Sequence, residues 1–202
     1  DYVVTEAGFG ADLGAEKFLD IKCRATGLAP SAVVLVATVR ALKYNGGVAK
    51  ADLNQQNVEA LKEGIPNLLR HVDNIQTVYG LPVVVAINAF PTDTSEELAL
   101  VEEECKKRGV NVVLSEVWAK GGKGGQALAE EVMRLCQTES KLTFAYDVKE
   151  SLKQKINDIA TKIYHADGVE FAPSAAKQLQ QLEELGFGEL PICMAKTQYS
   201  FT

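Results

Sequence analysis

The sequence predicts an α/β fold in which a mostly parallel sheet is flanked by helices. The first observation is a pair of apolar, β-branched runs at 32–38 and 83–87, which are typical of strands buried on both faces. The second is the alternation of such runs with single helical segments, which is typical of βαβ units and hence of a parallel sheet. Strands are expected at 2–5, 32–38, 83–87, 110–114, 142–146 and 190–194.

Apolar residues at helical spacing predict the intervening helices. These helices are expected near 15–25, at 53–79, from 94 to 109, and at 125–136, 151–164 and 173–185. Asp52 would cap the helix at 53–79, and Pro66 would kink or divide it, because proline lacks the amide that a helix interior needs. Thr94 begins the next helix and Gly109 ends it.

The composition of the 202-residue chain excludes several classes of protein. A net charge of -6 and a pI near 5.1 argue against a basic nucleic-acid-binding face. No apolar run approaches the roughly 18 residues that a membrane-spanning helix needs, and no secretory signal is visible. The four cysteines are widely scattered, and His71 and His165 lack the spacing of metal ligands. We therefore expect a cytoplasmic protein with reduced thiols and no membrane or nucleic-acid partner.

Positive charge follows the first buried run. Arg40, Lys43 and the pair Gly46–Gly47 come directly after it. Ligands of open α/β sheets bind beyond the carboxyl ends of the strands, so these residues are placed to meet an anionic ligand. The alternative is a solvated connection between strand and helix, in which the two charged side chains are structural and the glycines only form the turn.

A second candidate site lies near the start of the chain, where two acids flank a glycine-rich turn. Glu6 and Asp12 are candidate ligands for Mg²⁺, since a hard cation prefers oxygen donors. Gly8 and Gly10 would let the backbone approach a phosphate or substrate, and Phe9 could stack on a planar group. The alternative is that Asp12 only caps the helix that follows.

A third candidate site follows the buried run at 83–87. Asn88 and Asp93 could bind a purine edge through their amide and carboxylate groups. Phe90 and Pro91 offer an apolar platform for a flat heterocycle. If the strands at 83–87 and 110–114 are neighbours, Trp118 could clamp the same ring from its other side. The alternative for Trp118 is an ordinary core tryptophan.

The glycine- and lysine-rich loop at 119–125 suggests a phosphate-binding loop, but it does not match the pattern G-x-x-x-x-G-K-[ST]. Lys123 is followed by glycine, so the hydroxyl that would bind Mg²⁺ is missing. A lid, or a loop beside the tail of a substrate, is the better interpretation.

Several blocks of sequence resemble the formate–tetrahydrofolate ligase family and keep the family's order. They are TEAGFGADLGAEKF at 5–18, IKCR at 21–24, VATVRALKYNGG at 36–47, AINAFPTDT at 86–94, WAKGGKGG at 118–125 and LPICMAKTQ at 190–198. Together they span nearly the whole chain. The last block ends in the cluster 196–198, which follows an expected strand and is expected to face a ligand.

The resemblance implies a reaction and its substrates. ATP phosphorylates formate to formyl phosphate, and N10 of tetrahydrofolate attacks the formyl carbon, which gives 10-formyltetrahydrofolate, ADP and phosphate. It implies ATP with Mg²⁺ and leaves open a monovalent cation as a further cofactor. It also implies a homo-oligomer for the full-length enzyme, with residues 1–70 in a P-loop NTPase-like domain and 71–202 in a Rossmann-like, folate-binding α/β domain.

The resemblance also assigns residues to sites. Contacts with the pterin ring of folate are implied for Phe90, Pro91, Leu114 and Trp118. The remaining candidates line the nucleotide site or the catalytic cleft: Gly8, Phe9, Gly10, Asn88 and Asp93 as cleft residues, and Glu6, Asp12, Arg40 and Lys43 as catalytic ones. In this interpretation Lys120 or Lys123 would meet the glutamate carboxylates of the folate tail.

One departure from the family pattern limits the prediction. The glycine-rich loop ending in Gly-Lys-Ser-Thr, with which the family binds ATP, does not occur in this sequence. We therefore expect an internal fragment that supplies the cleft wall and the folate platform and does not turn over by itself. The alternatives are a non-catalytic α/β module that binds nucleotide or folate, and a structural fragment that needs further sequence to fold.

Overall fold

The computed structural model describes residues 1–195 and divides the chain into two compact units. The sheet unit is Pro30–Lys141, and the helical unit joins Asp1–Ala29 to the chain from Leu142 onward. The expected cluster at 196–198 lies outside the described residues. The predicted division near residue 70 falls inside the sheet unit; for the domains of the longer enzyme it stays a prediction.

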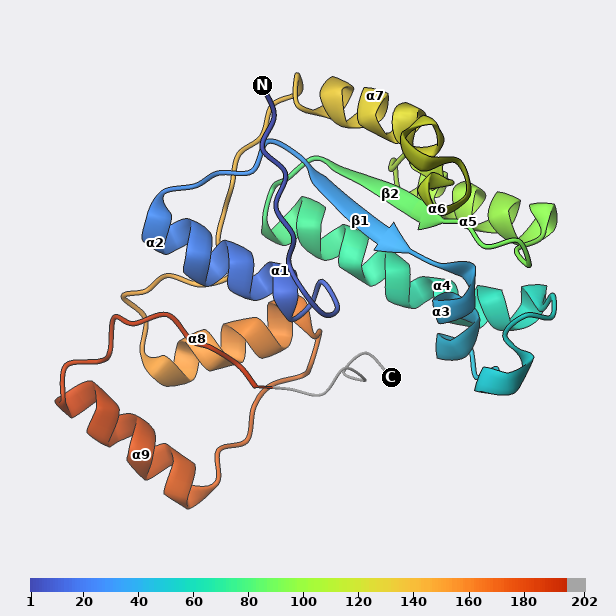
Figure 1. Cartoon of the computed structure of the whole chain (residues 1–202). Coiled ribbons are helices and arrows are strands. Elements are labelled where there is room, and N and C mark those ends of the chain that lie inside the picture. The colour runs from blue at the N-terminus through green and yellow to red at the C-terminus, as the bar shows by residue number, and fades with distance from the viewer. Residues whose placement is uncertain (196–202) are drawn as a thin grey trace. The chain divides into compact units, whose positions relative to one another are not determined.

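The sheet unit has the alternating order of elements that the sequence predicts (Figure 1). Its elements are β1 (Val33–Ala37), α3 (Val39–Asn45), η2 (Lys50–Asp52), α4 (Val58–Asp73), η3 (Asn74–Val78), β2 (Val83–Asn88), α5 (Ser95–Lys107), β3 (Val112–Ser115), α6 (Val117–Lys120), η4 (Gly121–Gly125) and α7 (Gln126–Leu135). The strands expected at 32–38, 83–87 and 110–114 are thus confirmed, as are the helices expected between 94 and 109 and at 125–136.

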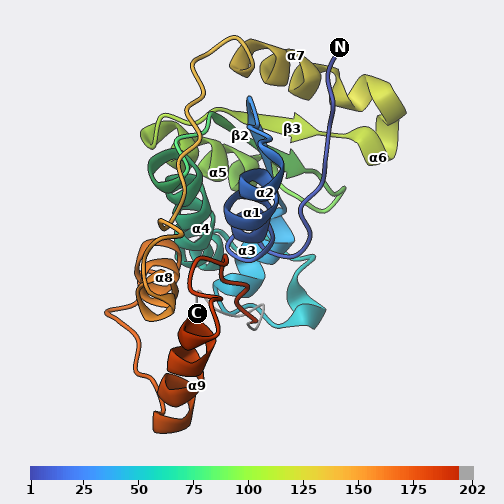
Figure 2. The ribbon, with the colours of Figure 1, turned by 90° about the vertical axis from the view of Figure 1, so that its left-hand side faces the viewer.

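The three strands form one parallel sheet in the order β1-β2-β3. β2 pairs with both neighbours, Val83 with Val33 and Asn88 with Ser115. Helix α4 lies on one side of the sheet and α7 on the other (Figure 1, Figure 2). Because both faces of β2 are covered, its apolar side chains are buried without alternation, which is the pattern of an inner parallel strand. The α/β class with a parallel sheet is confirmed.

β1 is an edge of this sheet and has a different pattern of burial. Leu35 and Ala37 face the core, whereas Val34 and Val36 are exposed. Successive side chains of a strand point to opposite faces, so one face of β1 carries apolar side chains that are open to solvent.

The predicted cap of α4 is wrong, and so is a division of the helix at Pro66; a kink there stays a prediction. The cap is Asn57, whose side chain accepts a hydrogen bond from the Ala60 amide at 3.0 Å, and Asp52 ends η2 instead. The helix also continues through Pro66. Pro66 lies on the exposed side of α4, where the Lys62 carbonyl that loses its partner can bind water. The π-helical segment η3 then extends the helix to Val78.

In the helical unit, α1 (Gly14–Lys17), η1 (Phe18–Cys23) and α2 (Arg24–Thr26) follow one another directly, as expected near 15–25. The second helical run consists of α8 (Leu152–Asp158) and η5 (Ile159–Ile163), and α9 is Pro173–Glu184. Both match the expected helices. In the described part of the chain, no helix is long and apolar enough to cross a membrane.

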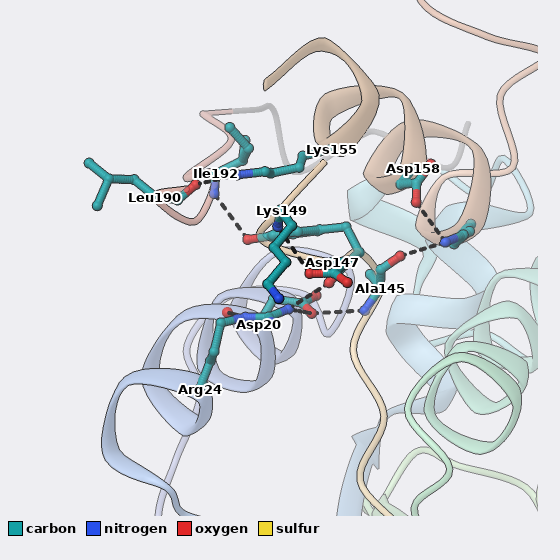
Figure 3. Close-up of polar contacts among 11 residues, drawn as sticks. Asp20, Arg24, Ala145, Asp147, Lys149, Lys155, Asp158, Leu190 and Ile192 are labelled. Carbon is teal, nitrogen blue, oxygen red and sulfur yellow. Dashed lines mark hydrogen bonds and ion pairs between the residues drawn. The ribbon is translucent and has the colours of Figure 1, made fainter. Parts of the chain in front are cut away.

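The prediction of strands at 2–5, 142–146 and 190–194 is wrong, because these segments have no regular secondary structure. The first is fully exposed. In the other two, side chains take the place of a neighbouring strand as hydrogen-bond partners of the backbone. Both backbone groups of Ala145 are bonded in this way: its amide donates to Asp20 at 2.8 Å, and its carbonyl accepts from Lys162 at 2.7 Å (Figure 3).

The segment after α9 is held in the same manner. Lys155 is fully buried, and its Nζ donates to the Leu190 carbonyl at 3.0 Å (Figure 3). It also donates to the Gly188 carbonyl at 2.5 Å. The Ile192 amide donates to the Tyr146 hydroxyl at 3.0 Å. The two apolar runs therefore form irregular chain, in which side chains bond backbone groups that a strand would bond in a ladder.

Asp20 is the centre of this arrangement. It is fully buried, bonds the Ala145 amide and lies 3.7 Å from Arg24, whose guanidinium donates to the Tyr146 carbonyl at 2.7 Å. The same guanidinium stacks on the Phe144 ring at 3.9 Å. One aspartate thus fixes both the helix that carries it and the chain at 144–146.

We expect Asp20→Ala to lower the free energy of unfolding by about 2–4 kcal/mol, because it leaves the buried Ala145 amide without its acceptor and removes the carboxylate that pairs with the Arg24 guanidinium. Urea denaturation would measure this. The matched control is Glu102→Ala, which removes an exposed carboxylate paired with Lys106 and should change stability by less than about 0.5 kcal/mol. Equal effects of the two substitutions would contradict the buried role of Asp20.

Candidate functional site

The carboxyl ends of the three parallel strands meet at one edge of the sheet. Asn88, the last residue of β2, is aligned with Ser115, the last of β3, and Ala37 at the end of β1 is aligned with Ile87. The connections that leave this edge carry the third candidate site and the positive charges that follow β1. This is the edge at which open α/β sheets bind ligands.

The four residues expected to contact folate lie along the ends of β2 and β3. Phe90 and Pro91 follow β2, Leu114 is in β3 beside Ile87, and Trp118 is in α6. The adjacency of β2 and β3, on which the clamp depends, is confirmed. Trp118 is 78% exposed and Phe90 36%, so the alternative of an ordinary core tryptophan is wrong.

The loop that carries Trp118 is closed on itself. The Glu116 amide donates to the Gly124 carbonyl at 3.0 Å, and the backbone of Glu116 lies so close to Gly124 that a Cβ there would clash with it. Lys120 forms an ion pair with Glu116 at 2.6 Å, whereas Lys123 is exposed. The two glycine pairs therefore form a tight turn beside the sheet edge, and glycine at 124 is required by close packing.

Phe90 begins a hydrogen-bonded turn. Its amide donates to Asp93 Oδ2 at 2.9 Å, and the Asp93 amide donates to the Phe90 carbonyl at 3.0 Å. The Arg40 guanidinium lies over the Phe90 ring, 5.5 Å from its centre. Burial raises the pKa of Asp93, and the charge of Glu97 adds to the rise. The hydrogen bond from the Phe90 amide opposes it, as do the charges of Lys43 and Arg40. Asp93 Oδ1 is buried without a hydrogen bond.

Lys43 and Glu97 form a fully buried ion pair at 2.9 Å. Lys43 also donates to the Gln55 carbonyl at 2.8 Å. Glu97 accepts from the Asn57 amide and from the amide and hydroxyl of Thr94. Burial alone would raise the pKa of Glu97, but the hydrogen bonds from Lys43, Asn57 and Thr94 hold it below its usual value. This arrangement favours the structural alternative for Lys43.

The second candidate site belongs to the helical unit. Glu6, Gly8, Phe9 and Gly10 are exposed, and Phe9 has a positive φ of 62°. Asp12 is buried, and its carbonyl accepts a hydrogen bond from the Tyr164 hydroxyl at 2.8 Å. The N-cap position of α1 is Leu13, so Asp12 is one residue removed from the capping position that the alternative requires.

Glu97 and Glu16 are among the buried carboxylates that were not predicted from the sequence. Glu97 is the acidic residue of a T-x-x-E capping box that begins at Thr94, a signal that predicts its bond to Thr94 but not its bond to Lys43. Glu16 has no exposed surface, and neither of its carboxylate oxygens has a hydrogen-bond partner. The sequence signal for the burial of Glu16 is its helical spacing from Leu19 and Cys23, because the three residues share one helix face and the other two are buried.

The environment of Glu16 disfavours its charged form. Burial raises the pKa of Glu16 to about 8, the nearby charge of Asp20 adds to the rise, and Lys17 opposes it. The pKa of Tyr164 is also raised, first by its own burial and then by Glu16. At neutral pH the folded chain therefore holds a proton on Glu16 that the unfolded chain releases.

No residues that would hold Mg²⁺-ATP are assigned within the described chain. Within 1–195, no group of three or more histidine, cysteine, aspartate or glutamate side chains is arranged to hold a metal ion. The turn at Gly121–Gly125 also lacks a hydroxyl next to Lys123. No catalytic step through bound nucleotide follows from these side chains.

Glu16→Gln is expected to stabilise the chain in a pH-dependent way. The folded pKa of Glu16 is raised, so its contribution to stability is fully present below the unfolded value of 4.5 and is lost as pH rises toward about 8. The variant, which cannot ionise, should gain about 3 kcal/mol more at pH 7 than at pH 4.5 relative to the unsubstituted chain. Urea denaturation at several pH values would measure the gain.

Glu6→Gln is the matched control, because Glu6 is exposed and near in sequence. Its stability should follow that of the unsubstituted chain across the same pH range. Parallel curves for Glu16→Gln and the unsubstituted chain would show that Glu16 ionises normally in the folded state.

Comparison with known protein families identifies the family of the chain. The family model described as formate--tetrahydrofolate ligase matches residues 1–202. This match implies ATP-dependent ligation of formate to tetrahydrofolate in the parent enzyme, and it does not favour a non-catalytic binding module. From the match over its whole length, the chain belongs to the formate–tetrahydrofolate ligase family.

Proposed function

We propose that this chain supplies the folate-binding wall of a formate–tetrahydrofolate ligase, at the carboxyl edge of β2 and β3. The observation that carries the proposal is the exposure of Phe90, Leu114 and Trp118 on two adjacent strands and their connections. Large apolar side chains are usually buried, and a group of them at a ligand-binding edge is typical of a site for a flat, apolar ring.

In this proposal Phe90 and Trp118 stack on the two faces of the pterin ring. Pro91 and Leu114 would contact its edges, and Asn88, at the end of β2, would hydrogen-bond its polar groups. Such a site acts mainly by positioning, because a bound and oriented amine reacts with an activated formyl group far faster than a free one. The stacked side chains would also exclude water from that amine.

Other assignments stay predictions. Glu6 and Asp12 as catalytic carboxylates, and Gly8, Phe9 and Gly10 as cleft residues, are supported only by the resemblance of their sequence block. The same holds for the P-loop NTPase-like and Rossmann-like domains, for Mg²⁺ and a monovalent cation, for a homo-oligomer and for a cytoplasmic location. Turnover by the 202 residues alone is not expected.

The proposal is tested by tetrahydrofolate binding. Trp118 is the single tryptophan of the chain, so its fluorescence reports on this site alone. Tetrahydrofolate should quench it saturably, and Phe90→Ala should weaken binding about tenfold, because a stacked aromatic ring is lost. Calorimetric titration would confirm the dissociation constants, since quenching can also arise without stacking.

Phe187→Ala is the matched control, as Phe187 is a similarly exposed phenylalanine in the helical unit. It should bind tetrahydrofolate like the unsubstituted chain. A chain that melts cooperatively but gives neither quenching nor heat with tetrahydrofolate would rule out a preformed folate site.

The turn at Gly121–Gly125 gives a second prediction. Replacement of Lys120 and Lys123 by alanine should weaken polyglutamylated tetrahydrofolate more than the monoglutamate, because two cations beside the folate tail are removed. The ion pair of Lys120 with Glu116 makes Lys123 the larger contributor. Competition binding with the two ligands would measure the ratio, and equal losses would count against this role.

A further inference from the structure

We propose that α3 braces the folate platform, with Arg40 and Lys43 as positioning residues that hold the Phe90–Asp93 turn from its two ends. This inference rests on the proposed function, because the platform matters only if the pterin ring binds there. In this inference Arg40 and Lys43 support the aromatic side chain of Phe90 and do not contact an anionic ligand.

The first step is the placement of the two charges on one short helix. Thr38 ends the connection from β1 and caps α3, its hydroxyl accepting from the Ala41 amide at 3.1 Å. Arg40 and Lys43 are three residues apart, so they lie on one side of α3. Both side chains contact the chain that follows β2, since Arg40 lies over the Phe90 ring and Lys43 pairs with Glu97.

The second step is the bond of Lys43 to the far end of the platform. Glu97 lies in the first turn of α5, and its carboxylate binds both Lys43 and the residue that caps α5, Thr94. Thr94 follows Asp93 directly. The buried ion pair thus fixes where α5 begins, and with it the point at which the Phe90–Asp93 turn ends.

The third step is the contact of Arg40 with the near end. Its guanidinium lies over the Phe90 ring. The main-chain amide of Phe90 donates to the Asp93 carboxylate, which holds the residue in the turn. A planar guanidinium over an aromatic face is attracted by the electrons of the ring and restricts its rotation. A ring covered on one face by Arg40 has its other face left for the pterin.

Burial separates this role from direct catalysis. Lys43 has no exposed surface, and its Nζ is engaged by Glu97 and the Gln55 carbonyl. It cannot touch a substrate without breaking both contacts. Holding the turn in its bound conformation lowers the entropy lost when a ligand orders it, so the brace should contribute to affinity without meeting the ligand.

The experiment measures tetrahydrofolate binding and thermal melting of the same variants. Arg40→Met should weaken binding about three- to tenfold with no change in melting temperature, because the cation–π contact with Phe90 is lost while the fold remains. Arg40→Lys keeps the charge but not the planar group, so its affinity for tetrahydrofolate should lie between those of the unsubstituted chain and Arg40→Met. Lys43→Met should weaken binding by about tenfold or more and also lower the melting temperature, because Glu97 is left buried without its partner.

The controls match the substitutions. Arg134→Met and Lys62→Met remove exposed cations of the sheet unit, which pair with Glu131 and Glu59, and should bind tetrahydrofolate normally. If Lys43→Met does not fold, Arg40→Met alone decides, since a purely structural role would not weaken binding while stability stays unchanged.

The possible results separate the two proposals. Unchanged affinity of Arg40→Met, in a chain that binds tetrahydrofolate, would overturn the brace and leave the folate site standing. Loss of affinity in the controls as well would also overturn it, because the effect would not be specific to α3. No binding by the unsubstituted chain would overturn the folate platform, and the brace with it.

Discussion

The pairing of β2 with a parallel strand on each side is the constraint on which the sheet unit depends. An inner strand must bond its amides and carbonyls on both edges and cover both faces, and β2 satisfies this with β1, β3 and the helices on either side. Because the three strands are parallel, every chain that leaves them starts from the same edge. Phe90, Trp118 and Arg40 are neighbours of that edge for this reason alone.

The buried ion pair of Lys43 and Glu97 is the second determinant of this edge. Two charges removed from water are tolerated only when each finds enough hydrogen-bond partners, and here the Gln55 carbonyl, the Asn57 amide and Thr94 supply them. The pairs on the outer surface of α5, such as Lys106 with Glu102, are solvated and contribute little. Geometry at the sheet edge is therefore fixed by one internal pair.

Much of the sheet unit could be predicted from the sequence, because local patterns determine it. The apolar runs of β1 and β2 and the capping box of α5 are short-range signals, and each formed the expected element. The irregular segment around Ala145 could not be predicted, since its backbone partners, Asp20 and Lys162, are remote in sequence or on another helix. An apolar run predicts burial, and only the tertiary partners decide whether it becomes a strand.

The same distinction applies to the candidate site. The positions of Phe90 and Trp118 relative to the strand ends followed from sequence, together with the condition that β2 and β3 be adjacent. The partner of Lys43 did not, because nothing local connects it to Glu97. The burial of Glu16 could not be predicted from a nearby polar partner, because its carboxylate has no hydrogen-bond partner. The only sequence signal for it is the position of Glu16 on an apolar helix face.

The open face and edge of β1 have a consequence for work with the isolated chain. Val34 and Val36 are solvent-exposed beside a row of backbone groups available to another strand. An exposed apolar edge strand can template association with a second molecule. Concentrated preparations should therefore self-associate through β1, and a lysine in place of Val36 should keep them dispersed.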